Sequence, residues 1–545
     1  MTIPSYSICT ELSRHFHKPS FQGIIFSQKK LFILHRQKFS NHATVCGILL
    51  TEGWIKQGFM EKYFEPFRKN TIGYDQEFTT PYGTKQMIYA DWIASGRYYQ
   101  PIEDKLIKQF GPYIGNTHTE TSTTGTLMTN AYHHAQQIIK EHVNAGENDA
   151  LIFAGYGMTA AINKMQRILG LKSCGVLRRN DCLQGRERPV VFVTHMEHHS
   201  NHTSWFETIA DVVQLKPDKD LLIDLNELET QLEKYKDRKL KIGSFTAASN
   251  VTGVETPYHE MARLMHRYNG LCFIDFAASA PYADINMHPG DEQAKLDGVF
   301  FSPHKFLGGP GTSGVMIFDS NIYKNPIPDH PGGGTVDWTN PWGEYKYIDD
   351  IEAREDGGTP GFLQAIKTSL ACRLKEQMGT ENMRNREDEL LRIAFRRMDK
   401  MKNVNILANN VRERLGVISF YIDNMHYNLG VKLLNDLAGI QTRGGCACAG
   451  TYGHFLLNVS YEDSHRITEL INHGDLSHKP GWIRLSLHPT MTNQELDTVM
   501  DTLEYITHNH EKLAKSYRYN PHTNEYHHIS EPEDKTNYVA PWFEL

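Results

Sequence analysis

The chain lacks long apolar runs and is poor in cysteine, and both shortages exclude classes of protein. No stretch of about eighteen or more apolar residues occurs, so a membrane-spanning helix is excluded and no membrane partner is expected. Eight cysteines in 545 residues are too few for a disulfide scaffold, so a reducing compartment, the cytoplasm, is expected. The body of the chain also lacks a Lys/Arg block and the net charge is −7, so no nucleic-acid partner is expected.

Acidic residues are nearly missing from the first forty positions, which hold six Lys and Arg against the single acid Glu11. A basic, acid-poor N-terminus is typical of organelle transit peptides. This segment has no arginine-rich amphipathic stripe, and Pro4 and Pro19 interrupt it. We therefore interpret residues 1–85 as an N-terminal extension, with a transit peptide as the alternative.

From about residue 86 the chain alternates apolar strands with amphipathic helices. Helical spacing of apolar residues occurs at 158–170 and 258–270. The alternation predicts an α/β fold with a mostly parallel sheet that has helices on both faces. The strand candidates are nearly continuous apolar runs, as strands covered on both faces require, at 189–194, 240–246, 271–276, 298–302 and 315–318.

The C-terminal third has a different pattern, with helical stretches at 382–402 and 426–439 around strands at 418–422 and 482–487. Thr492 and Glu495 have the spacing of a capping box, which predicts the start of a final helix. The Gly- and Pro-rich segment 326–361 is interpreted as a connection. We therefore expect a large domain over 86–345, a smaller α+β domain over 346–510 and a C-terminal tail over 511–545.

Lys305 stands in the most informative passage, FSPHKFLGGPG at 301–311. It directly follows a predicted strand, so it leaves the sheet at a carboxyl end, where α/β proteins form their sites. The glycines after it allow the backbone to approach a ligand closely. A lysine that bonds covalently to a carbonyl group needs such a placement and a lowered pKa. A solvated lysine beside a glycine turn is the alternative.

Asp275 ends an otherwise apolar strand in the run CFIDFAAS at 272–279. A buried carboxylate needs a cationic partner to remain charged. The protonated ring nitrogen of pyridoxal 5′-phosphate (PLP) is such a partner, and an acid at that position makes the ring an electron sink. A helix N-cap or a local ion pair is the alternative.

Two more runs combine a turn with the start of a helix. GYGMTAAIN at 155–163 places glycines before a helix whose unpaired amides suit a phosphate, although Thr159 could be a simple N-cap. THMEHHSNHTSW at 194–205 follows a strand, and its histidines suit either stacking on an aromatic ligand or metal ligation. The spacing of His198, His199 and His202 lacks the regularity of a metal site, so no metal is expected.

Taken in order, these motifs resemble those of the class V aminotransferase family, and most closely the cysteine desulfurases. The resemblance covers about residues 86–510. It implies the PLP-dependent transferase fold type I, with a mostly parallel seven-stranded sheet in the large domain and a smaller α+β C-terminal domain. The matched positions are Asp91 and Ala94 in YADWIASG, Gly157-Met158-Thr159, Glu197-His198, Ser249-Asn250, Asp275-Phe-Ala-Ala, Ser302-Pro-His304-Lys305, Gly358-Thr359-Pro360 and Trp482-Ile-Arg484-Leu-Ser486.

The resemblance also implies roles for these residues. Lys305 would hold PLP covalently and move protons, Asp275 would pair with the ring nitrogen, and His198 would stack on the ring. Asn250 and Arg484 would bind O3′ of the cofactor or the carboxylate of an amino-acid substrate. The phosphate would be held by residues of two copies of the chain, which implies a homodimer: Met158, Thr159, Ser302 and His304 of one copy and Thr359 of the other.

Cys448 points to the type of reaction. One group of cysteine desulfurases carries a nucleophilic cysteine five residues after an arginine, and Cys448 has this spacing from Arg443. A thiolate is the attacking form, and a nearby cation such as Arg443 favours it. The resemblance implies release of alanine from cysteine, a persulfide on Cys448, a possible sulfur-acceptor protein as partner, and Arg443 among the substrate-binding residues.

Several alternatives remain open at this point. Cys446 and Cys448 could bind zinc with His454, could serve packing alone, or could form a strained disulfide. Ala278 and Thr119 stand where desulfurases usually have other residues, and the fold also hosts transaminases, epimerases and C–C lyases. A non-catalytic regulator with the same fold is the alternative of a different class.

Overall fold

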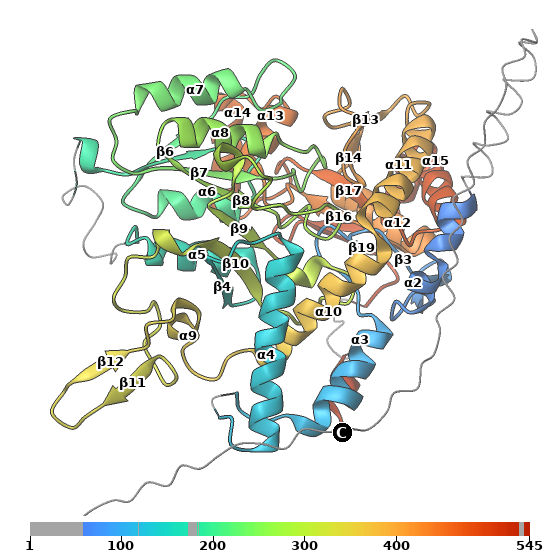
Figure 1. Cartoon of the computed structure of the whole chain (residues 1–545). Helices are drawn as coiled ribbons and strands as arrows, with labels where there is room; N and C mark the ends of the chain where they lie inside the picture. The colour runs from blue at the N-terminus through green and yellow to red at the C-terminus, as the bar shows by residue number, and fades with distance from the viewer. Residues whose placement is uncertain (1–57, 118, 173–182, 184, 533–538) are drawn as a thin grey trace, which may run out of the picture. The chain divides into compact units, whose positions relative to one another are not determined.

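The computed structural model describes residues 58–545 except 118, 173–182, 184 and 533–538 (Figure 1). The basic segment considered as a transit peptide lies outside the described residues, as does His118, the neighbour of Thr119. Within the described part of the chain, no helix combines the length and the apolar character that a bilayer crossing requires.

A seven-stranded sheet forms the core of the larger half of the fold, in the order β4–β10–β9–β8–β7–β5–β6. Strands β9, β8, β7, β5 and β6 are parallel, whereas β10 is antiparallel to both of its neighbours. The predicted mostly parallel seven-stranded sheet is confirmed. The strands are β4 (Asp149–Ala154), β5 (Val190–Val193), β6 (Asp211–Gln214), β7 (Lys241–Thr246), β8 (Leu271–Asp275), β9 (Gly298–Phe301) and β10 (Gly314–Asp319).

Helices cover both faces of this sheet, as predicted. Along β5, Val190 and Phe192 belong to one buried cluster and Val191 and Val193 to another, so successive side chains pack on opposite faces. This is why the strands are continuously apolar. The main helices of this part are α4 (Thr123–His142), α5 (Met158–Ile168), α6 (His199–Phe206), α7 (Leu225–Lys234), α8 (Tyr258–Arg267) and α10 (Phe362–Met378).

A four-stranded antiparallel sheet, in the order β13–β14–β17–β16, forms the second half. The predicted capping box at the start of α15 is present: Thr492 Oγ1 accepts from Glu495 N at 2.9 Å, and Thr492 N donates to Glu495 Oε2 at 2.7 Å. The elements are β13 (Val404–Ile406), β14 (Val417–Ile422), β16 (Arg443–Gly445), β17 (Trp482–Ser486), α11 (Thr380–Met398), α12 (Tyr427–Ala438) and α15 (Asn493–Ala514).

Short elements fill stretches where the sequence has no clear period. The segment 326–361 contains a hairpin, β11–β12, and one short helix, α9 (yellow in Figure 1). The segment after α15 contains another hairpin, β18–β19. These and the remaining elements are α2 (Glu65–Lys69), β1 (Glu77–Thr80), β2 (Gly83–Gln86), β3 (Ile88–Tyr89), α3 (Gln100–Lys105), β11 (Val336–Thr339), β12 (Tyr345–Tyr347), α9 (Ile351–Glu355), β15 (Ile440–Gln441), α13 (Gly450–Leu456), α14 (Tyr461–Asn472), β18 (Tyr517–Asn520) and β19 (Glu525–His528).

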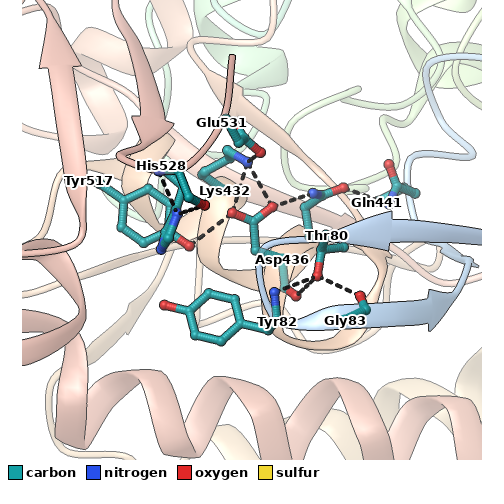
Figure 2. Close-up of polar contacts among 11 residues, drawn as sticks. Thr80, Tyr82, Gly83, Lys432, Asp436, Gln441, Tyr517, His528 and Glu531 are labelled. Atoms are coloured by element: carbon teal, nitrogen blue, oxygen red, sulfur yellow. Dashed lines mark hydrogen bonds and ion pairs between the residues drawn. The ribbon is translucent and has the colours of Figure 1, made fainter. Parts of the chain in front are cut away.

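Asp436 on α12 joins segments from both ends of the described chain (Figure 2). Its carboxylate is fully buried and accepts hydrogen bonds from Lys432 Nζ at 2.7 Å and from the Tyr517 hydroxyl at 2.8 Å. Its carbonyl oxygen accepts from Thr80 Oγ1 at 2.8 Å. Lys432 Nζ also donates to Glu531 Oε1 at 2.6 Å. One carboxylate therefore holds β18 against α12, while its backbone holds the β1–β2 hairpin.

We expect Asp436→Ala to loosen the β18–β19 hairpin. The Tyr517 hydroxyl would lose its buried acceptor, which lowers the free energy of local opening by about 2–3 kcal/mol. Amides of β18 should then exchange with solvent roughly 30- to 150-fold faster in a hydrogen–deuterium exchange experiment. Glu511→Ala, which removes an exposed carboxylate from α15, should leave that rate unchanged. Equal exchange in both variants would contradict the role of Asp436.

Candidate active site

A cavity of about 660 Å³ lies at the carboxyl edge of the seven-stranded sheet, between that sheet and the loop after β16. Parallel strands deliver their following residues to one edge, which explains why residues distant in sequence meet here. Ala94 and Ala278 also line it. The predicted site residues that line this cavity are Met158, Thr159, His198, Asn250, Asp275, Ser302, His304, Lys305, Arg443, Cys448 and Arg484.

Lys305 and Asp275 carry opposite charges on the cavity wall, and loss of water perturbs both. Burial lowers the pKa of the Lys305 amine to about 8, although Asp275 opposes this shift. Burial raises the pKa of the Asp275 carboxyl to about 6, against the hydrogen bond from Ala277 N at 2.8 Å and the charge of Lys305. An amine near neutrality and a buried acid that needs a cation fit a covalently held pyridine cofactor.

The turn before α5 forms the end of the cavity predicted to hold a phosphate. Met158 N donates to Ser302 Oγ at 2.9 Å, and His304 Nδ1 donates to the carbonyl oxygen of Tyr156 at 3.0 Å. A Cβ atom on Gly157 would lie 3.0 Å from both Ser302 Oγ and His304 Cε1, so only glycine fits without a shift. The positive end of the α5 helix dipole therefore lies beside a hydroxyl and an imidazole group. Such a combination suits the binding of a phosphate.

His198 caps α6 and lines the cavity as a neutral ring. Its Nδ1 accepts from Ser200 N at 3.1 Å. Burial, followed by the charge of Lys305, lowers the pKa of His198 to about 3. A neutral imidazole can lie on an aromatic ligand without bringing a second cation next to Lys305.

Asp91 lies between the two arginines of the site. Arg443 on β16 and Arg484 on β17 are direct neighbours across the strand pair, where like charges repel. Asp91 Oδ1 accepts from Arg484 Nη2 at 2.8 Å, and its Oδ2 accepts from Arg443 Nε at 2.9 Å. Sequence reasoning matched Asp91 to a family motif without assigning it a role; an acid inside the apolar run YADWIA was the available signal.

Two polar atoms beside these arginines have no partner among the described residues, Asn250 Oδ1 and Arg484 Nε, and both are buried. Arg484 Nη1 donates to the Asn250 carbonyl at 3.2 Å, and Asn250 Nδ2 donates to the Ala447 carbonyl at 2.7 Å. Unsatisfied buried atoms are costly unless a ligand supplies their partner. This pair fits the predicted contacts to a cofactor hydroxyl or a substrate carboxylate.

The two neighbouring cysteines have different surroundings. Cys448 is exposed and lines the cavity, whereas Cys446 is half-buried and packs in an apolar cluster with Tyr452 and Trp482. Both thiols are free, so the disulfide alternative is wrong. His454 Nδ1 donates to the Gly450 carbonyl at 2.8 Å, and its Nε2 bonds with Ser464 Oγ at 2.9 Å. In the described ranges, no three His, Cys, Asp or Glu side chains are grouped so that they could hold a metal ion.

Thr359 lies outside this cavity. It is exposed, and its Oγ1 accepts from Asn116 Nδ2 at 3.3 Å. Its contact with the phosphate site of a second copy stays a prediction. Sequence reasoning did not select Tyr156, in the turn before α5, or Asn163 and Arg167 on α5, which also line the cavity.

Comparisons with known proteins point to one family. The family model for class-V aminotransferases matches residues 88–499. A probable cysteine desulfurase of Halalkalibacterium halodurans is 28% identical over 371 residues, which are 67% of this chain and 84% of that protein. One of Staphylococcus aureus is 26% identical over 403 residues, 71% of this chain and 91% of that protein.

Two solved structures share the fold. They are a cysteine desulfurase of Thermococcus onnurineus (TM-score 0.64, 20% identity, 81% of this chain and 97% of that one) and the cysteine desulfurase CsdA of Escherichia coli (TM-score 0.59, 20% identity, 76% and 94%). They confirm the predicted α/β fold of type I PLP-dependent transferases. Since the family model spans most of the residues described, the chain belongs to the class-V aminotransferase family, whose members are PLP-dependent enzymes.

Proposed function

We propose that the protein is a cysteine desulfurase that binds PLP in this cavity and converts L-cysteine to alanine, leaving the sulfur as a persulfide on Cys448. One observation carries the proposal: the exposed thiol of Cys448 and the amine of Lys305 line the same cavity, together with Arg484. A transaminase has no use for a thiol at that position. The names of the relatives at 26–28% identity support the same reading.

Each cofactor contact in the proposal uses a group already described. Lys305 would hold PLP covalently, Asp275 would pair with its ring nitrogen and His198 would lie on the ring. The bound cofactor supplies an electron sink that makes the Cα proton of an amino acid labile. The phosphate would be bound by Met158, Thr159, Ser302 and His304.

Lys305 is the group proposed to move protons. With a pKa of about 8, a useful fraction of the amine is neutral near pH 7–8 and can accept the Cα proton. The exposed face of Arg443 and the free Nε of Arg484 would bind the substrate carboxylate, while Asp91 keeps both guanidinium groups oriented. In this proposal the substrate sulfur would face the loop that carries Cys448.

Sulfur transfer needs no oxidant or reductant. The Cys448 thiolate attacks the substrate sulfur, so an S–S bond forms and the Cβ–S bond breaks with its electron pair left on carbon. Cβ then takes up a proton, Lys305 returns its proton to Cα, and the products are alanine and the persulfide. The exposure of Cys448 lets a sulfur-acceptor protein reach the persulfide. A cytoplasmic location and a homodimer complete the proposal.

The cofactor assignment is tested by borohydride reduction of the purified protein. We expect a yellow protein in which reduction fixes PLP to the peptide that contains Lys305. Lys375 is a matched control, because burial also lowers the pKa of this amine to about 8 and yet it does not line the cavity. Lys305→Ala should lose the label and Lys375→Met should keep it. Label on Lys375, or none, would refute the assignment.

Replacing each cysteine in turn tests the sulfur chemistry. Cys448→Ala should lower alanine formation from L-cysteine by at least about 100-fold, the scale of losing a nucleophile, while the absorption of bound PLP is kept. Cys446→Ala should change the rate little, because its thiol packs away from the cavity. The persulfide should be trapped on Cys448 and identified by mass spectrometry. Keto-acid-dependent transamination without alanine from cysteine would favour the transaminase alternative instead.

Mixed subunits test the proposed homodimer. Thr359→Asp should repel the partner's phosphate, and Lys305→Ala should remove the cofactor lysine, so each variant alone should be inactive. If Thr359 serves the second copy, a mixed dimer has one intact site, and random mixing restores about a quarter of wild-type sites. Alanine formation after unfolding and mixing is the measurement. Two results would contradict this arrangement. One is an active monomer in sedimentation, and the other is no recovery of activity when the two variants refold together into dimers.

A further inference from the structure

The backbone around Cys448 has an unfavourable conformation that its surroundings must hold. Ala447 and Cys448 have φ angles of +49° and +57°, so two consecutive residues with side chains occupy the left-handed region. Such conformations are strained for residues other than glycine and persist only where neighbouring contacts determine them. Ala449 N donates to the Cys446 carbonyl at 3.0 Å, which closes the turn but does not tie it to the rest of the protein.

His199 ties this loop to the other half of the fold with two hydrogen bonds. Its backbone N donates to the Cys448 carbonyl at 2.8 Å. Its ring Nε2 accepts from Gly450 N at 3.0 Å. The two bonds hold the loop at the residues on either side of Ala449, immediately beside the thiol. A Cβ on Gly450 would lie 3.2 Å from His199 Nε2, so glycine is what permits this approach.

The tie requires a neutral imidazole with its proton on Nδ1, because Nε2 must accept. Burial, with a smaller effect from Lys479, lowers the pKa of His199 below its ordinary value, which favours that form. His199 is the first residue of α6, and the preceding His198 faces the cavity. The adjacent histidines therefore have different roles: His198 lines the cofactor cavity, and His199 holds the loop that carries the thiol.

We propose that His199 is a positioning residue, which keeps the Cys448 thiol at the cavity by fixing the strained loop 446–450 through the Gly450 amide and the Cys448 carbonyl. This inference rests on the proposed desulfurase function for its catalytic consequence. Its structural part, the tie between the His199 ring and Gly450, does not depend on that function.

Three substitutions distinguish the effect of the accepting ring nitrogen from the effect of the ring itself. His199→Ala removes both, His199→Phe keeps a ring without an acceptor, and His199→Gln places an amide oxygen where Nε2 accepts. Loss of one hydrogen bond should raise the equilibrium constant for loop opening about tenfold. The Gly450 amide should then exchange with solvent about tenfold faster in the Ala and Phe variants. The Gln variant should exchange as the wild type does. His508→Ala, which removes an exposed imidazole from α15, is the control.

The same proteins, loaded with PLP, give the catalytic readout. In the Ala and Phe variants the kcat for alanine formation should fall, by up to about tenfold, because the thiol spends a smaller fraction of the time beside the substrate. KM for cysteine and the absorption of bound PLP should stay the same, and Gln should restore kcat. A general structural defect would lower PLP content and would not be rescued by Gln.

The outcomes distinguish the two proposals. Wild-type protein that forms no alanine from cysteine would overturn the proposed function, and Gly450 exchange would still test the tie. Wild-type activity with unchanged kcat in the Ala and Phe variants would overturn the positioning role of His199. Unchanged Gly450 exchange in those variants would overturn the tie itself.

Discussion

Removal of water from charged groups at the carboxyl edge of the seven-stranded sheet is the constraint on which the site depends. Burial acts on Lys305 and Asp275 in opposite senses, lowering the pKa of the amine and raising that of the carboxyl. Ionisation of Asp275 lowers the stability of the folded protein, because its pKa is higher there than in the unfolded chain. This loss of stability begins as the pH rises above the ordinary pKa of an aspartate and is complete above about pH 6. A cationic ring nitrogen beside the carboxylate would offset this cost, so the buried acid favours the ligand that the family uses.

Much of the fold could be predicted because its strands are buried on both faces. Five of the seven strands of the large sheet, including β8 and β9, stand out as continuous apolar runs. In contrast, β6 is half-buried along its length and holds only two apolar residues, so no pattern distinguishes it from a loop. The hairpins β11–β12 and β18–β19 are short and largely exposed, and side-chain periodicity carries little information there.

The members of the site could be predicted for a related reason, since most of them follow a strand whose position is clear. Their pairings could not. Asp91 and Arg484 are 393 residues apart, and Asn250 reaches the Ala447 carbonyl across 197 residues. No local spacing encodes such contacts, which arise only when the two sheets meet. The left-handed turn at Cys448 was equally hidden, because neither alanine nor cysteine signals it in the way that glycine or asparagine does.

These long-range contacts make the geometry of the thiol depend on how the smaller sheet sits against the larger one. Arg443 and Arg484 belong to the smaller sheet, and Asp91 pairs with Ser486 in an isolated bridge beside β17. The loop of Cys448 follows β16 directly but is held by Asn250 and His199, which come from the other half. The groups that would hold the cofactor come from the strand ends, turns and helices of the larger half. The arginines belong to the smaller sheet, whereas the loop of the thiol is held by both halves. A shift of the smaller sheet would therefore change the spacing between the nucleophile and the carboxylate-binding groups across the substrate.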